Sequence, residues 1–178
     1  MSTNSTIGIR RIDGTESRIY CHWDGYIEGV GITLQIYYNS AELIEQLLKL
    51  GNLSSLDKNI IPDSENNFDN GVKDACLPYT VRGEKWEQVP ITQREDYNYT
   101  FDERYNLWFV EYSDYEEYVI PDVHIRFNYD RHTSEPLIEA INRKFKEHPD
   151  YFDINPTELS ELNREVGSKY ANSPYASF

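Results

Sequence analysis

The sequence predicts an α+β fold with a mainly antiparallel sheet, two N-terminal helices on one face and a helical C-terminal extension. Short runs of alternating apolar and polar residues, typical of strands, recur through most of the chain. The last third changes to apolar residues at helical spacing. We therefore expect an α+β core domain over residues 1–128 and a helical extension and tail over residues 129–178. A chain of 178 residues can bury a sizeable core without disulfide or metal staples.

The N-terminal part should form a β-hairpin and then two helices. Asp13-Gly14 separates alternating runs at residues 6–12 and 17–23, which is a strong hairpin pattern. A first helix is expected around residues 30–37, and a second from a capping-box pattern at 39–42 to a glycine stop at residue 51. The apolar residues that define these elements are Ile7, Ile9, Ile19, Cys21, Val30, Leu34, Tyr37, Leu43, Ile44, Leu47, Leu48 and Leu50.

Polar residues at 57–74 indicate a loop, and more strands should follow it. The C-terminal part should form one helix with Pro136 in its first turn and the face Leu137, Ile138, Ile141 and Phe145. A second helix should run from Pro156 to about Val166 and stop near Gly167. The remaining predicted strands cover residues 76–81, 97–101, 107–112, 118–120 and 123–127, the last two kept apart by Pro121.

The net charge of −14 is concentrated in the middle of the chain. Residues 57–122 contain 16 acidic and 6 basic residues, which gives −10 for this segment alone. A field of this sign repels phosphate backbones, so direct binding to nucleic acid is disfavoured and a basic protein partner is favoured. The alternative, that the acidity only keeps the protein soluble, is equally compatible with the sequence.

Tyrosine is the second unusual feature, with 15 copies. Tyrosines are enriched at interfaces because each combines a rigid contact area with one hydrogen-bonding group. Several lie within the acidic segment. The predicted partner-binding residues are Glu95, Asp96, Tyr97, Tyr99, Asp102, Glu103, Tyr112, Asp114, Tyr115, Glu116 and Glu117.

Residues 20–31 concentrate aromatic, ionisable and glycine residues before a predicted helix. Two glycines could let backbone amides approach an anion, although a lone Gly-x-Gly is a weak pattern. His22 and Asp24 could form an acid–base pair or could simply cap the turn, and the structural role is favoured. No catalytic residue is therefore assigned. The candidate ligand-binding residues are His22, Trp23, Asp24, Tyr26, Gly29, Gly31, Tyr79 and Arg82.

Some of these motifs resemble a group of small proteins encoded by bacteriophages, prophages and plasmids. The resemblance covers roughly residues 6–112 and implies a mobile-element origin without an activity. The chain departs from the group at Ile27, where proline is usual, at Asn52, where aspartate is usual, and in its added C-terminal tail. The matching segments are Tyr-Cys-His-Trp-Asp-Gly-Tyr at 20–26, Glu-Gly-Val-Gly at 28–31, Leu-Gly-Asn-Leu-Ser-Ser-Leu at 50–56, the hairpin segments 97–101 and 108–110, and more weakly residues 79–84.

The composition indicates a cytoplasmic protein, in the host cell if it is phage-encoded. The first residues lack the pattern of a signal peptide, and no apolar run approaches the length of about 20 residues that spans a bilayer. Cys21 and Cys76 are far apart and outside any metal-ligand spacing. His124 and His132 are more typical of surface histidines than of a metal site. We expect no metal, cofactor or membrane contact, and a homodimer remains open.

The resemblance, together with the acidic, tyrosine-rich segment, favours a mobile-element accessory protein that inhibits a host protein such as a nucleic-acid-handling defence enzyme. Its acidic, tyrosine-rich surface would partly mimic nucleic acid. The alternative is a sponge for small nucleotides, in which Trp23 or Tyr26 stacks on the base and Arg82 neutralises phosphate. An enzyme that uses His22 and Asp24 is the least favoured hypothesis.

Overall fold

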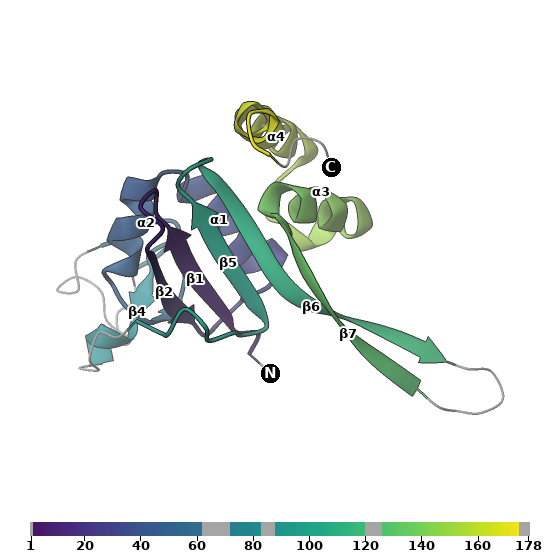
Figure 1. Cartoon of the computed structure of the whole chain (residues 1–178), viewed down its shortest axis with the longest axis horizontal. Helices are drawn as coiled ribbons and strands as arrows, with labels where there is room; N and C mark the ends of the chain where they lie inside the picture. Colours follow the sequence, from purple (N-terminus) through teal and green to yellow (C-terminus); the bar gives the residue numbers. More distant parts are fainter. Residues whose placement is uncertain (1, 62–71, 83–87, 120–125, 175–178) are drawn as a thin grey trace.

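A seven-stranded mixed sheet forms the centre of the computed structural model, which describes residues 2–61, 72–82, 88–119 and 126–174 (Figure 1). Residues 81–82, 114–119 and 126–133 are described by their backbone only. The strand order across the described sheet is β4-β3-β2-β1-β5-β6-β7. The strands are β1 (Ser5–Arg10), β2 (Glu16–Cys21), β3 (Leu53–Ser55), β4 (Leu77–Pro78), β5 (Tyr97–Asp102), β6 (Leu107–Val119) and β7 (Arg126–Pro136).

Four of the six strand pairings are antiparallel, which confirms the predicted α+β class with a mainly antiparallel sheet. The two parallel pairings join β1 to β5 and β2 to β3. The pairing of β1 with β5 places two predicted hairpins side by side. The short strand predicted at residues 76–81 is limited to β4, and the chain continues as the 3₁₀ helix η2 (Tyr79–Arg82).

The N-terminal hairpin forms as predicted. Gly14 has a φ of 86°, which a residue without a side chain adopts easily in a tight turn. Ile7 of β1 lies opposite Ile19 of β2, and both are completely buried. This face of the hairpin is therefore part of the core.

Two short helical segments follow β2 and lie on one face of the sheet (Figure 1). The π-helix η1 (Ile27–Gly31) leads directly into α1 (Ile32–Tyr37). The next helix, α2 (Ala41–Leu48), is capped by Ser40, whose side chain accepts a hydrogen bond from the Leu43 amide. Tyr37 was expected on the apolar face but is exposed, and its neighbour Tyr38 is buried instead.

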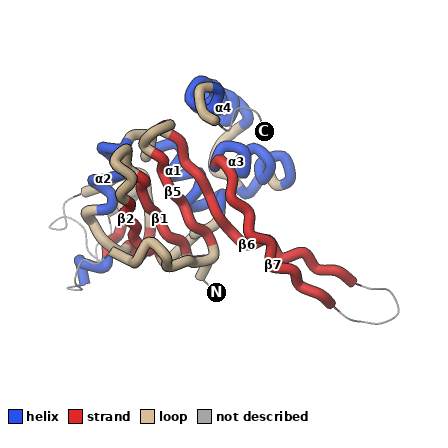
Figure 2. Tube along the Cα trace, in the orientation of Figure 1, coloured by secondary structure: helices blue, strands red, loops and turns tan. Residues whose placement is uncertain are grey.

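The hairpin of β6 and β7 extends well beyond the rest of the sheet (Figure 2). The predicted pair of short edge strands around Pro121 is wrong, because β6 continues to Val119 and β7 begins at Arg126; Pro121 itself lies outside the described residues. The last residue of β6 that pairs with β5 is Tyr112. From residue 113 onward β6 pairs with β7 alone. We call residues 113–119 and 126–132 the arm.

The C-terminal helices follow β7 without an intervening loop. Pro136 ends β7 and is the N-cap of α3 (Leu137–Glu147), so it precedes the first turn that it was expected to occupy. The short 3₁₀ helix η3 (Pro149–Tyr151) leads to α4 (Pro156–Ala171), which continues through Gly167 instead of stopping there. The boundary proposed between residues 128 and 129 lies within β7.

Candidate functional site

Three of the predicted partner-binding residues belong to the core. Tyr99 is 0 %, Asp102 1 % and Tyr112 2 % exposed. Tyr99 lies in register with Ile7 of β1 and Val110 of β6, so its ring shares their face of the sheet, which the helices cover. These three residues cannot present a surface to a partner in this fold.

The acidic residues at both ends of β5 make contacts within the chain. Asp96 accepts a hydrogen bond from the Asn4 amide at 3.1 Å, and Glu103 accepts one from the Ile12 amide at 3.0 Å. Glu95 accepts one from the Gln93 side chain at 2.9 Å. Asp96 and Glu103 therefore tie the segments around Asn4 and Ile12 to the ends of β5, whereas Glu95 makes only a local contact.

The remaining predicted acids lie in the arm. Asp114, Glu116 and Glu117 belong to the part of β6 beyond Tyr112, together with Tyr115; their side chains lie outside the described residues. In the backbone register Asp114 is opposite Arg131 and Glu117 is opposite Asn128. The structure thus places these residues away from the body of the sheet, on a two-stranded ribbon (Figure 1).

A group of polar contacts holds the base of the arm to α3. The guanidinium of Arg143 donates to both carboxylate oxygens of Glu135 and, at 2.6 Å, to the hydroxyl of Tyr112. The carboxylate raises the pKa of Arg143 above its ordinary value. Tyr112 also stacks on half-buried Tyr97, with ring centroids 5.4 Å apart. Together these contacts join α3, β5, β6 and β7.

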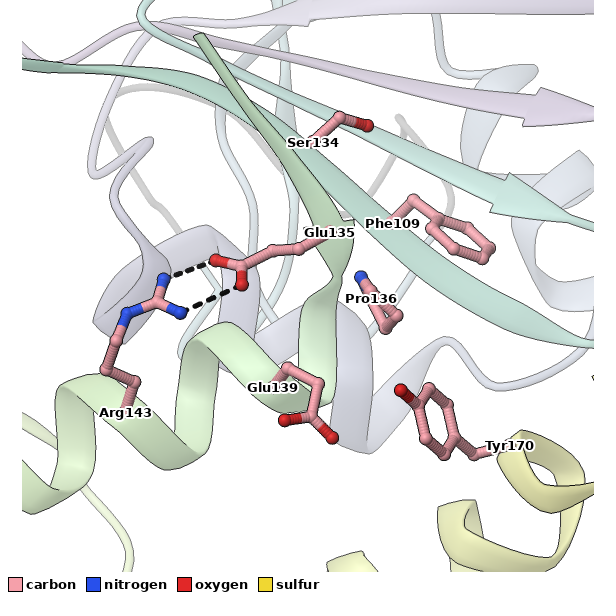
Figure 3. Close-up of a pocket in the computed structure, with 7 residues that line it drawn as sticks. All are labelled: Phe109, Ser134, Glu135, Pro136, Glu139, Arg143 and Tyr170. Carbon is pink, nitrogen blue, oxygen red and sulfur yellow. Dashed lines mark hydrogen bonds and ion pairs between the residues drawn. The ribbon is translucent and has the colours of Figure 1, made fainter. Parts of the chain in front are cut away.

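An open pocket of about 360 Å³ lies beside these contacts (Figure 3). Figure 3 shows the Arg143–Glu135 pair on one side, the apolar side chains on the other, and Glu139 between them. Only the i, i+4 spacing of Glu139 and Arg143 marks this pocket in the sequence, so no local pattern predicts it. The lining residues are Phe109, Ser134, Glu135, Pro136, Glu139, Arg143 and Tyr170.

The side chains of residues 22–26 make contacts with their neighbours rather than forming a catalytic pair. The Nδ1 atom of His22 is 2.6 Å from the hydroxyl of Tyr20. Asp24 instead accepts a hydrogen bond from the hydroxyl of Tyr26 at 2.8 Å. Trp23 is about half exposed and meets the His22 ring edge to face. The described contacts therefore do not support an acid–base role for His22 with Asp24.

The backbone amides proposed to bind phosphate already donate hydrogen bonds within the chain. The amides of Gly29 and Gly31 both donate to the carbonyl oxygen of Tyr26, at 3.1 and 3.3 Å. A Cβ atom on Gly29 would lie 2.4 Å from the carbonyl oxygen of Asp24. Glycine is therefore required here for a tight backbone approach, and the amides are not available to an anion.

Asn52 links the end of β2 to the segment that contains Tyr79. Its side-chain oxygen accepts from the Tyr20 amide, and its carbonyl oxygen accepts from the Tyr79 amide, both at 3.0 Å. Tyr79 thus lies beside the end of β2. The side chain of Arg82 lies outside the described residues, so its proposed contact with phosphate stays untested.

Cys21 and Cys76 are buried free thiols. The Sγ atom of Cys76 is 3.2 Å from the hydroxyl of Tyr38. Burial raises the pKa of both thiols, to about 12 for Cys21, so neither has the exposed, acidic character of a reactive cysteine.

Within the described residues, no group of three or more histidine, cysteine, aspartate or glutamate side chains could hold a metal ion. None of the helices in that part of the chain has the length and apolar character that a bilayer crossing requires. The chain matches no family model, and no curated protein or solved structure matches it at a significant level.

Proposed function

We propose that this protein is a mobile-element accessory protein that binds a basic surface of a host protein through its arm, and that the partner is a nucleic-acid-handling defence factor. The observation that carries the proposal is the extension of β6 beyond its pairing with β5. The extended part of β6, residues 113–119, contains three acidic residues and no basic residue.

The shape of the arm supports a role in binding. A two-stranded ribbon is only marginally stable in water, and a partner that covers the ribbon would stabilise it. The part of β6 beyond Tyr112 also has an edge that no described strand covers, with the backbone groups that another chain can pair with. The arm as a whole carries four acidic and two basic residues, so its net negative charge suits a basic groove.

The charge of the protein supports the same class of partner. The net charge of −14 speeds encounter with a basic surface through long-range attraction and disfavours phosphate-bearing ligands. The amides of Gly29 and Gly31 donate hydrogen bonds within the chain, so they are not available for the phosphate contacts that the nucleotide-binding hypothesis requires. We therefore retain protein binding alone.

The test compares two variants with equal changes in charge. The arm variant carries Asp114→Asn, Glu116→Gln and Glu117→Gln, and the control carries Glu42→Gln, Glu147→Gln and Glu161→Gln at exposed helix positions. Each serves as bait in a pull-down from host lysate, and association with the recovered partner is then measured at low and physiological salt. We expect about tenfold slower association for the arm variant than for the control at low salt. Equal association by the two variants would refute a role of the arm.

A further inference from the structure

We propose that the pocket at the base of the arm receives an arginine side chain of the basic partner. The inference rests on the proposed function for the identity of the partner, but the pocket itself can be tested without it. Phe109 and Glu135 line the pocket from β6 and β7, at the point where the arm leaves the sheet. The pocket therefore lies close to the base of the arm, where the proposed partner would bind.

The charges in the pocket leave one carboxylate available. Arg143 is engaged by both oxygens of Glu135 and by Tyr112, so this pair contributes little net charge. Glu139 lies four residues before Arg143 on α3 and is exposed. Among the described residues, no hydrogen bond or ion pair engages its carboxylate. The lining residues thus carry two negative charges and one positive charge, so the pocket suits a cation.

The walls suit a flat cation with an apolar stem. Phe109 and Tyr170 contribute aromatic rings and Pro136 contributes its apolar ring. Guanidinium groups stack on aromatic rings and pair with carboxylates through two parallel hydrogen bonds, which an ammonium group cannot do. Burial raises the pKa of Tyr170, and the negative charge of Glu139 acts in the same direction, as expected if the two groups are close.

An anion or a neutral ligand fits the pocket less well. The donors of Arg143 are directed at Glu135 and Tyr112, so an anion would have to displace an existing bidentate pair. A neutral apolar ligand would leave the charge of Glu139 without compensation. An arginine side chain can both stack on the aromatic rings of the pocket and pair with the carboxylate of Glu139.

The experiment titrates the full chain with N-acetyl-arginine amide and follows backbone amide resonances by NMR. The matched probe is N-acetyl-citrulline amide, which has nearly the same shape without the charge. We expect arginine to shift resonances around Phe109, Glu135, Glu139 and Tyr170 with a dissociation constant on the order of millimolar, and citrulline to bind at least about tenfold more weakly. N-acetyl-lysine amide should fall between the two.

Two variants connect this binding to the pocket. Glu139→Gln should weaken arginine binding about tenfold, because it removes the charge and keeps the shape. Glu147→Gln, at the far end of α3, removes the same charge outside the pocket and should leave binding unchanged. Equal binding of arginine and citrulline, equal binding by the two variants, or shifts that map elsewhere would each overturn the inference. Slow partner association by the arm variant would then still support the proposed function, so the two proposals can fail separately.

Discussion

The hydroxyl of Tyr99 donates a hydrogen bond to the carbonyl oxygen of Gly25 at 2.7 Å, in the buried interior. Tyr99 belongs to the segment expected to bind a protein, and Gly25 to the segment expected to bind a small ligand. Gly25 itself packs against the backbone of Thr3 and Asn4, where a Cβ atom would lie 2.8 Å from three backbone atoms. This contact shows that parts of both segments are structural.

Tyr99→Phe should destabilise the protein by about 1–2 kcal/mol, because the buried carbonyl oxygen of Gly25 would lose this donor. Urea unfolding measures the change. Tyr151→Phe is the control, since Tyr151 is 57 % exposed and its hydroxyl can bond to water. Equal stability of the two variants would show that the Tyr99 hydroxyl contributes nothing.

Two glycine-to-alanine substitutions should have opposite effects. Gly29→Ala should cost about 1–3 kcal/mol or more, because its Cβ atom would overlap the carbonyl oxygen of Asp24. Gly167→Ala should stabilise the protein by about 0.5–1 kcal/mol, because Gly167 lies inside α4 and a new Cβ would have no atom within 4 Å other than its chain neighbours and the backbone of its own helix. Thermal unfolding monitored by circular dichroism measures both; a stabilising Gly29→Ala would contradict the structure.

Alkaline pH should destabilise the fold progressively from about pH 9. Burial raises the pKa of Cys21 from 9.0 to about 12 and that of Tyr20 from 10.0 to about 12. The unfolded chain therefore loses these protons first, and stability present below pH 9 falls toward pH 12 by up to about 1.4 kcal/mol per pH unit for each group.

The shifted pKa of Arg18 has the opposite effect on stability over part of this alkaline pH range. Burial lowers the pKa of Arg18 below its ordinary value, so this group opposes the decline in stability at the alkaline end of the range. Urea unfolding between pH 8 and 10 reports mainly on the two buried thiols, Cys21 and Cys76. Cys21→Ala should lower stability at pH 8 but flatten the decline above pH 9, and an unchanged slope would exclude Cys21 as its cause.

Nucleotides should not stabilise the protein. A ligand at one hundred times its dissociation constant adds about 2.7 kcal/mol, which raises the melting temperature by several degrees. Because the amides of Gly29 and Gly31 are engaged, we expect no such rise with mono-, di- or cyclic nucleotides. A rise that Trp23→Ala abolishes without unfolding the protein would reinstate the nucleotide hypothesis.

Local sequence patterns predicted the elements whose determinants are local. Asp13-Gly14 defines the first hairpin, and the polar residues at 39–42 mark the start of α2, although the N-cap is Ser40 and not Asn39, with which the predicted capping box begins. The hairpin of β5 and β6 also follows from its alternating residues. In each case the residues that specify the element are within a few positions of it, so one window of sequence contains the information.

The remaining features depend on contacts between distant residues. The burial of Tyr99 follows from its register with Ile7, and no local pattern specifies this parallel pairing. Gly167 is predicted to end a helix, but α4 continues past it. The capping box of Asn155 and Glu158 stabilises the start of α4, and the buried side chains of Leu162 and Val166 pack the helix against the core up to the glycine. The pocket joins Phe109 to Tyr170, which only the tertiary fold brings together.

The parallel pairing of β1 with β5 also has a consequence during synthesis. Thr6 donates to Asn98 across 92 positions of the chain, so the centre of the sheet cannot close until β5 has left the ribosome. At typical elongation rates this takes roughly 5–20 s. Throughout that interval the N-terminal hairpin has an open edge next to the apolar side chains of Ile7 and Ile9, where another nascent chain could pair. This edge is therefore open to premature pairing until β5 arrives.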